Sequence, residues 1–489
     1  MANGNLSGRV ASGVAWSISE KAGSMLLQAV VSIVVANMLV PLDLGIMAVL
    51  TVFTALAQVV VDSGFSQTLI RKANPTDGDY KAVFRFNVIT SIVLYALLTA
   101  LSPVAARYYG WPELARVAPV LFLLLPANAL CVIQNTIMVR EFRFAQLSAI
   151  TFAASLASGI VAVVMAVSGC GVWSLVGQRV SMMAVKAALL WIRSPWRPRA
   201  ACKASSLGEM APYSLRLMGT DLITALYNNI APLFIGKIYS GDALGCFNQA
   251  QKLKDMPVNS AMQSIQSVTF PALARIGGDE TKFAESYRRV VMVTAFAMFP
   301  AMAGLIATAD DIYALLLKPD WRPAVPYFRI LCLTGIFYPL STIAYNILKV
   351  RSDGGIILRL EFVKRAMTTI ILIITIPRSV EAVAWGLAAS AACEAIVNTL
   401  AARRYTSLGI RRTARTLLPI SVLTLFMYVA VVGVAHLTAH WHVALRLATE
   451  ILSGASIYAA GAYLARMEAF GEVRTIVAEL IGKTKRRII

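Results

Sequence analysis

The sequence predicts an all-α integral membrane protein with about fourteen transmembrane helices. Three observations predict this class. Of the 489 residues, 58% are hydrophobic and 14% are charged, whereas about a quarter of the residues in soluble proteins are charged. Apolar stretches of about twenty residues, the length that crosses a bilayer, separate the charged segments. Basic residues are also divided unevenly between alternate loops.

Windows of mainly apolar residues place these helices in order along the chain. The first six are predicted at Gly13–Leu39, Gly45–Ile70, Phe84–Ala105, Val117–Met138, Leu147–Val167 and Val172–Ile192. The next six are predicted at Tyr213–Ile235, Leu244–Phe270, Val290–Ala309, Phe328–Leu348, Ile356–Ile376 and Val383–Ala401. The last two are predicted at Leu417–Val434 and Leu445–Leu464.

Loop charges support both the number of helices and their orientation. One set of alternate loops holds only seven basic residues, which are Arg107, Arg116, Lys237, Lys318, Arg322, Arg378 and Arg446. The other set holds roughly four times as many, and an excess of Lys and Arg marks cytoplasmic loops. A missed helix would invert every later loop. We therefore expect a multi-pass membrane protein with both termini in the cytoplasm.

Several other functional classes are disfavoured. The net charge of +20 lies in short clusters between apolar stretches, whereas a nucleic-acid-binding protein concentrates such charge on one soluble face. The predicted loops are too short for a catalytic or nucleotide-binding domain, and no GxxxxGK[ST] motif is present. We expect no cofactor and no metal. The histidines His436, His440 and His442 lack neighbouring acidic or cysteine ligands and are predicted to form an exposed polar turn.

A weak internal repeat predicts the domain organisation. Short motifs recur in the same order at offsets of 200, 211 and 212 residues: Leu44-Gly45 with Leu244-Gly245, Asn135 and Val139-Arg140 with Asn346 and Val350-Arg351, and Trp173 and Leu175 with Trp385 and Leu387. Such a repeat predicts two pseudo-symmetric six-helix lobes, 1–203 and 204–412, followed by two C-terminal helices and a basic cytoplasmic tail in 413–489. Internal repeats that enclose a central site are a common plan of transporters.

Polar residues within the predicted helices are the candidate functional residues, because burying an ionisable group in a bilayer is costly without a role or a partner. Several lie on one side of their helix at a spacing of three or four residues. The candidates for a substrate pathway are Glu20, Lys21, Asp62, Arg179, Arg216, Asp221, Lys252, Asp255, Asn259 and Gln263. These residues predict a water-filled cavity lined by the first two helices of each lobe.

A structural interpretation of the same residues stays open. Polar side chains also join membrane helices to one another, and Glu20–Lys21 and Lys252–Asp255 would then be ion pairs. Three basic residues near predicted cytoplasmic helix ends, Arg216, Lys364 and Arg365, are expected to extend to the lipid headgroups. The adjacent acids Asp310 and Asp311 are expected to lie at a solvated helix end.

Short motifs in the first seventy residues and near residues 235–273 resemble those of a known family. They are Gly13-Val14-Ala15-Trp16, Pro41, Asp43, Leu44-Gly45, Asp62, Gly64-Phe65-Ser66, Leu69-Ile70, Ile235-Gly236, Leu244-Gly245 and Phe270-Pro271-Ala272-Leu273. With the length and hydropathy of nearly the whole chain, they resemble the polysaccharide transporter family. That family belongs to the multidrug/oligosaccharidyl-lipid/polysaccharide flippase superfamily.

The resemblance implies a flippase that moves an undecaprenyl-pyrophosphate-linked oligosaccharide repeat unit to the periplasmic leaflet by alternating access. The implied uses are lipopolysaccharide, capsule or exopolysaccharide biosynthesis. The implied partners are the lipid-linked oligosaccharide, membrane lipids, and polysaccharide polymerase and export proteins. Basic candidates would counter the pyrophosphate, amides and hydroxyls would bind sugars, and acids would pair with the bases or carry a proton. Ala231-Pro232 stands where relatives often have an acid, which disfavours a coupling role for that helix.

Three other functions stay open. A multidrug antiporter of the same superfamily usually has twelve helices and an acidic cavity, so fourteen helices and interior Lys and Arg disfavour it. A lipid II flippase of the same superfamily also has fourteen helices. A membrane polymerase or ligase of lipid-linked sugars usually needs a large periplasmic loop, and the outside loops predicted here are short. Neither the glycan nor a coupling ion can be identified from the sequence.

Overall fold

The computed structural model describes residues 23–62, 64–72, 74–199, 204–275, 280–351, 355–406 and 410–475. Every regular element within these ranges is a helix. Ten helical stretches of the described chain are long and apolar enough to cross a membrane. Gly23–Ala36 is a shorter apolar helix. Three further long helices, α9, α10 and α14, carry more charge.

These helices confirm the predicted all-α membrane fold. Counted with Gly23–Ala36, α9 (Ala204–Ile238), α10 (Gly241–Arg275) and α14 (Gly355–Thr375), the described residues provide one helical segment for each predicted span. Two of the spans are each built from two consecutive helices. The chain is therefore a multi-pass membrane protein. Two of its three more charged spans, α9 and α10, together carry six of the candidate site residues.

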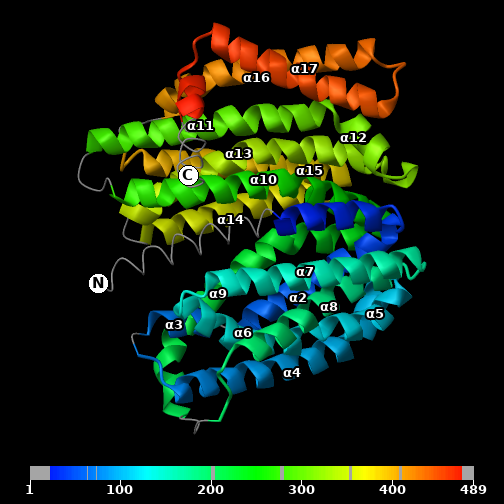
Figure 1. The fold of residues 1–489 in the computed structure, drawn as a ribbon, viewed down its shortest axis with the longest axis vertical. Helices are drawn as coiled ribbons and strands as arrows, with labels where there is room; N and C mark the ends of the chain where they lie inside the picture. The colour runs from blue at the N-terminus through cyan, green and yellow to red at the C-terminus, as the bar shows by residue number, and fades with distance from the viewer. Residues whose placement is uncertain are drawn as a thin grey trace, which may run out of the picture. The chain divides into compact units, whose positions relative to one another are not determined.

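The chain divides into two compact units, 1–248 and 249–489. Unit 1 contains α2 (Pro41–Asp62), α3 (Phe65–Arg71), α4 (Asp77–Tyr109), α5 (Pro112–Phe122), α6 (Leu124–Arg140), α7 (Phe144–Val167), α8 (Val172–Arg193), α9 and the start of α10. Within it α7 packs against α8, α4 packs against α5 and α6, and α2 packs against α9 (Figure 1). The repeat-based lobe boundary at residue 203 stays a prediction.

Small side chains make the close packing of α7 possible. Ala154, Ser158, Ala162 and Ala166 are buried and recur every fourth residue, so they form one row along the helix. Such rows of small residues let membrane helices approach closely and gain van der Waals contact. On α8, a Cβ added to Gly177 would lie 2.4 Å from the Met165 sulfur. Gly177 therefore allows α8 to approach Met165 of α7 closely.

The repeated Leu-Gly motifs meet within unit 1. A Cβ on Gly45 of α2 would lie 2.2 Å from the carbonyl oxygen of Gly241, and a Cβ on Gly245 of α10 would lie 1.8 Å from that of Pro41. The two contacts are reciprocal, because residues 41 and 45 face residues 241 and 245. Only glycine allows backbones to approach this closely. The offset of 200 in the sequence thus corresponds to a two-fold-like helix crossing.

Unit 2 contains the rest of α10 and α11 (Glu280–Ala307), α12 (Ala309–Leu316), η1 (Pro319–Trp321), α13 (Ala324–Arg351), α14, α15 (Val380–Ala402), α16 (Ile410–Leu437) and α17 (Val443–Leu464). Within it α13 packs against α15 and α11, and α16 packs against α11 and α17 (Figure 1). Tyr458 of α17 donates a hydrogen bond to the Phe296 carbonyl oxygen of α11, with an oxygen–oxygen distance of 3.0 Å. The last two helices are therefore held by buried contacts with α11.

Candidate functional site

The ten candidate residues fall on several helices. Glu20 and Lys21 lie outside the described residues, and so does the side chain of Gln263. In unit 1, Asp62 lies on α2, Arg179 on α8, and Arg216 and Asp221 on α9. In unit 2, Lys252, Asp255, Asn259 and Gln263 lie on α10. Each unit is described separately below.

Asp62 forms a small polar cluster at the end of α2. The Asn128 side-chain nitrogen on α6 donates a hydrogen bond to the Asp62 carboxylate at 3.1 Å. Lys186 of α8 lies within electrostatic range of the carboxylate, as does the Cys131 thiol of α6. No cationic group of the described residues lies within 4.0 Å of Asp62, so its bonded partner is a neutral amide. A carboxylate held this way keeps its capacity to bind a cation or a proton.

One of the two α9 candidates, Arg216, belongs to an exposed polar row, whereas Asp221 is half-buried. Arg216, Thr220, Thr224 and Asn228 are all exposed and recur every fourth residue, so they share one face of α9. Thr220 and Thr224 donate hydrogen bonds to the carbonyl oxygens four residues earlier. Because unit 1 leaves this row uncovered, these groups are available for a polar ligand. Arg179 of α8 is also exposed.

On α10 Asp255 has an ion-pair partner that is adjacent in the sequence. Asp255 pairs with Lys254 at 2.6 Å, and the suggested Lys252–Asp255 pair stays a prediction. Lys254 is buried and its amino group donates to the Thr334 hydroxyl of α13 at 3.3 Å, which fixes it beside Asp255. Lys252 and Asn259 are exposed and lie seven residues apart on one face. Lys254 had not been singled out from the sequence.

A second charged cluster occupies α13, α14 and α15. Lys364 lies 2.5 Å from Glu361, and its amino group sits 4.8 Å from the Tyr345 ring centroid. Arg365 lies 3.5 Å from the same glutamate, and Glu394 of α15 is within electrostatic range of Lys364 and Arg365. Lys364 is 7% exposed. The expectation that Lys364 and Arg365 extend to the headgroups is therefore wrong, because Glu361 offers a nearer partner.

The spacing of these residues could have revealed this cluster. Glu361 precedes Lys364 by three residues and Arg365 by four, and side chains at these spacings meet on one helix face. Asp311 likewise differs from the expected solvated helix end. Its side chain is 4% exposed and accepts hydrogen bonds from Arg446 of α17, whereas Asp310 pairs with Arg329 of α13. Neither partner could be identified from local spacing.

Comparisons with known proteins identify the family. Residues 34–326 match the family model described as "Polysaccharide biosynthesis protein". The chain is 24% identical over 334 residues to the teichuronic acid biosynthesis protein TuaB of Bacillus subtilis, covering 67% of this chain and 68% of that protein. It is 23% identical over 358 residues to the succinoglycan biosynthesis transport protein ExoT of Rhizobium meliloti, covering 73% and 72%.

The fold also has a solved counterpart. The lipid II flippase MurJ, in an inward closed conformation, superposes with a TM-score of 0.70 at 15% sequence identity. The superposition covers 93% of this chain and 99% of that one. At this identity the likeness concerns the fold alone. The family model, in contrast, spans more than half of the sequence. The chain belongs to the polysaccharide biosynthesis protein family of multi-pass membrane proteins.

Proposed function

We propose that this protein is a flippase, and not an enzyme, for an undecaprenyl-pyrophosphate-linked oligosaccharide repeat unit. It moves the repeat unit from the cytoplasmic to the periplasmic leaflet of a bacterial inner membrane. Family membership carries the proposal, since ExoT, a relative along about three quarters of this chain, is named a transport protein. The uncovered polar row of α9 supports it, because a bilayer-spanning helix gains nothing from facing lipid with such groups.

The substrate has a charged part and a polar part, and the candidate residues match both. The proposed pyrophosphate ligands are Lys21, Arg179, Arg216 and Lys252, because phosphate groups accept charge-assisted hydrogen bonds from basic side chains. Asn259 and Gln263 are proposed to bind sugar hydroxyls, which both donate and accept hydrogen bonds.

The acidic candidates have a different role in this proposal. Glu20, Asp221 and Asp255 balance the basic groups when the substrate is absent, and Asp255 has such a neighbour in Lys254. Asp62 is proposed to take up a proton or a cation during the cycle, because its hydrogen-bond partner Asn128 is neutral. Binding a cation there would neutralise a half-buried carboxylate that has no ion-pair partner among the described residues.

Transport is proposed to proceed by alternating access of two lobes, 1–203 and 204–412. Both termini are proposed to lie in the cytoplasm, and the excess of Lys and Arg in one set of alternate loops supports this orientation. The repeat unit would then be presented to periplasmic polymerase and export proteins, which are the proposed partners. Lipid II is a second cargo to test, because a fold like that of MurJ does not by itself select between lipid-linked saccharides.

This proposal is tested by measuring which leaflet holds the lipid-linked repeat unit in cells that lack the protein. The gene is deleted, and the precursor is probed with a saccharide-cleaving enzyme added to intact spheroplasts, which reaches the outer leaflet only. We expect full-length precursor to accumulate in a protected form and the surface polymer to be lost. Re-expression of the wild-type chain should restore enzyme access.

Other outcomes contradict the proposal in distinguishable ways. Precursor that reaches the outer leaflet but stays unpolymerised would indicate a polymerase or ligase. Trapped lipid II with a normal surface polymer would indicate cell-wall precursor transport. A normal polymer together with increased sensitivity to cationic drugs would indicate a multidrug antiporter.

A further inference from the structure

Unit 2 contains a groove whose lining includes none of the proposed transport residues. It has a volume of about 920 Å³ and is formed by α11, α16 and the segment that follows α17. Buried Met292, Ile420 and Ala469 form its floor. Its outer wall is made by Leu418, Val422 and Phe426 of α16, each at least 60% exposed. In a membrane-spanning helix, exposed apolar side chains face lipid.

One end of the groove is basic. Its lining contains three arginines and one acid, namely Arg288, Arg412, Arg415 and Glu468. Arg288 donates two hydrogen bonds to Glu468, at 2.9 and 2.5 Å, so this acid is already engaged by α11. Arg289 of α11 likewise pairs with Glu472 at 3.1 Å. Among the described residues Arg415 has no ion-pair partner, and the lining as a whole holds three arginines for one acid.

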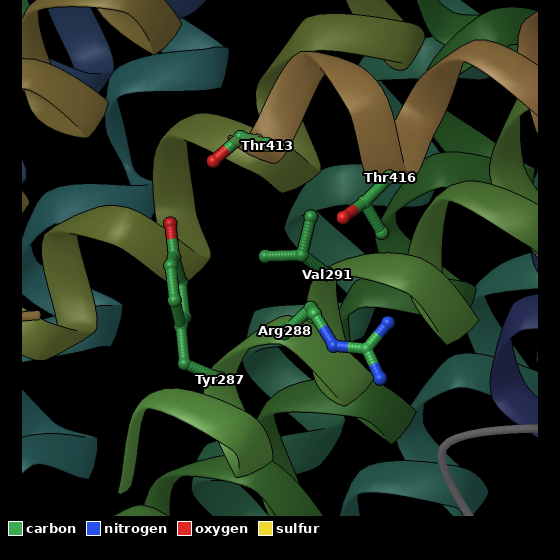
Figure 2. Close-up of a pocket in the computed structure, with 5 residues that line it drawn as sticks. All are labelled: Tyr287, Arg288, Val291, Thr413 and Thr416. Carbon is green, nitrogen blue, oxygen red and sulfur yellow. The ribbon is translucent and has the colours of Figure 1, made fainter. Parts of the chain in front are cut away.

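A small crevice adjoins this basic end. It is lined by Tyr287, Arg288 and Val291 of α11 and by Thr413 and Thr416 of α16, and Arg288 and Thr416 also line the groove. Figure 2 shows Arg288 on the Thr416 side of the crevice and Tyr287 on the other side. The crevice has no room for a water molecule. Helices α11 and α16 are thus packed closely behind Arg288, which favours a fixed position for the groove's basic end.

The length of the groove fits one leaflet of a bilayer. Arg415, Leu418, Val422 and Phe426 follow one another at spacings of three and four residues, so they form one row on α16. Eleven residues of helix span about 16 Å at a rise of 1.5 Å each. That is about half of the roughly 30 Å hydrocarbon core. A ligand with an anionic head at Arg415 and one acyl chain along Leu418 to Phe426 would fill it.

From this charge and length we infer that the groove binds an anionic glycerophospholipid of the cytoplasmic leaflet. The phosphate lies among Arg288, Arg412 and Arg415, and an acyl chain lies along the apolar row of α16. A soluble anion would use only the basic end, and a zwitterionic lipid would bring its own positive charge next to the arginines. The bound lipid would stabilise the packing of α16 on α11, because these helices contribute Ile420 and Met292 to the floor of the groove.

The probe is dioleoylphosphatidylglycerol, added to the purified full-length protein in detergent, with dioleoylphosphatidylcholine as the zwitterionic comparison. Native mass spectrometry measures the fraction of protein that retains lipid, and a thermal unfolding scan measures Tm. We expect phosphatidylglycerol, but not phosphatidylcholine, to be retained and to raise Tm. Arg412→Gln with Arg415→Gln should lower retention about tenfold or more, given the contribution of each basic residue near an anionic headgroup.

Two matched controls separate the groove from general charge or hydrophobicity. Arg403→Gln with Arg404→Gln removes two exposed arginines of unit 2 that do not line the groove, and should leave retention unchanged. Leu418→Trp with Val422→Trp fills the groove but keeps its arginines, and should also abolish retention. Leu425→Trp with Val429→Trp adds the same bulk at exposed positions of α16 outside the groove, and should have no effect.

Several results would overturn the inference. Equal retention of phosphatidylglycerol by the wild type and by either groove variant would remove the site. An equal rise in Tm with inorganic phosphate in place of phosphatidylglycerol would identify an anion site that does not bind lipid. Displacement of phosphatidylglycerol by an equimolar amount of undecaprenyl phosphate would assign the groove to the carrier lipid. If the arginine variant does not fold, the tryptophan pair and its control decide the question alone.

Discussion

Asp62 in unit 1 and Glu361 in unit 2 both place a carboxylate within a predicted membrane span, but their partners differ. Glu361 is shared by two cations of its own helix, Lys364 at 2.5 Å and Arg365 at 3.5 Å. Asp62 instead accepts a hydrogen bond from the neutral amide of Asn128. The Glu361 carboxylate is neutralised by cations of its own helix, whereas the Asp62 carboxylate can bind another cation.

This difference separates charges that stabilise the fold from charges that can act in transport. A buried ion pair stabilises the fold only while both partners are present. A carboxylate without an ionic partner can change its state during a transport cycle. We therefore expect variants of the unit 2 cluster to lose stability and variants of Asp62 to lose transport.

The largest loss of stability is expected for Glu361→Gln. It leaves Lys364, which is 7% exposed, without its close counter-charge. Removing one member of a buried pair costs about 3–5 kcal/mol. Tm of the purified protein should fall sharply, whereas Glu381→Gln, at an exposed first-turn position of α15, should leave Tm unchanged. If Lys364→Met is added to Glu361→Gln, part of the loss should be recovered. An unchanged Tm in the single variant would show that the cluster is not structural.

Asp62→Asn is expected to affect transport and not stability. The amide keeps the volume and can still hydrogen-bond to Asn128, so Tm should stay within the range of the wild type. Transport of the lipid-linked repeat unit should fall about tenfold or more, the effect of losing one charged polar contact. Asp242→Asn, an exposed acid in the first turn of α10, serves as the control. A drop in Tm like that of Glu361→Gln would place Asp62 among the structural charges.

A smaller difference in stability is expected between variants of the two acids beside Arg446, Asp311 and Glu450. Asp311 accepts hydrogen bonds from Arg446, whereas the nearest oxygen of Glu450 lies 3.6 Å from the arginine Nε, too far for a good hydrogen bond. Asp311→Asn should therefore destabilise the protein by about 2 kcal/mol, as expected when a buried charged group loses its partner. Glu450→Gln should cost less than half of that. Equal shifts of Tm in the two variants would show that Arg446 depends on both acids.

The smallest effect is expected for the Arg288–Glu468 pair, which is largely exposed. The hydrogen bonds from Arg288 lower the pKa of the Glu468 carboxyl below its usual value. Because the folded-state pKa is the lower one, the pair stabilises the fold above the unfolded pKa of about 4.3 and loses that contribution as pH falls through the folded value. Solvent screening keeps it below about 1 kcal/mol.

Glu468→Gln should therefore lower Tm slightly at pH 7, and the difference from the wild type should be smaller at pH 3. Thermal scans of both proteins at the two pH values measure it. A difference that grows as the pH falls would have the wrong sign for a carboxyl of lowered pKa.

The spans could be predicted from the sequence because they depend on composition over about twenty residues. The same apolar windows also predict the more charged helices α9, α10 and α14, and the alternation of loop charges supports their number. The Leu44-Gly45 and Leu244-Gly245 motifs predicted a repeat. Their reciprocal contact could not be predicted, because it depends on how α2 and the start of α10 cross.

Side-chain partners were harder to predict, since a long side chain can reach several neighbours, including residues distant in the sequence. Lys254 pairs with Asp255 because Thr334, 80 residues later, holds its amino group. Asp311 meets Arg446 across 135 residues, which no local pattern shows. The Glu361–Lys364 pair, in contrast, has a local signature. Lys364 does not extend to the headgroups because Glu361, three residues earlier on the same helix face, binds its amino group.

Transport by the purified protein tests the central claim most directly. The chain is reconstituted into liposomes with a fluorescent undecaprenyl-pyrophosphate-linked oligosaccharide, and dithionite bleaches only the outer leaflet. We expect wild-type protein to make nearly all of the fluorophore accessible. Liposomes without protein should stay at about half, and Asp62→Asn should slow the exchange. Accessibility that stays at half with folded wild-type protein, across pH gradients and added cations, would contradict the flippase account.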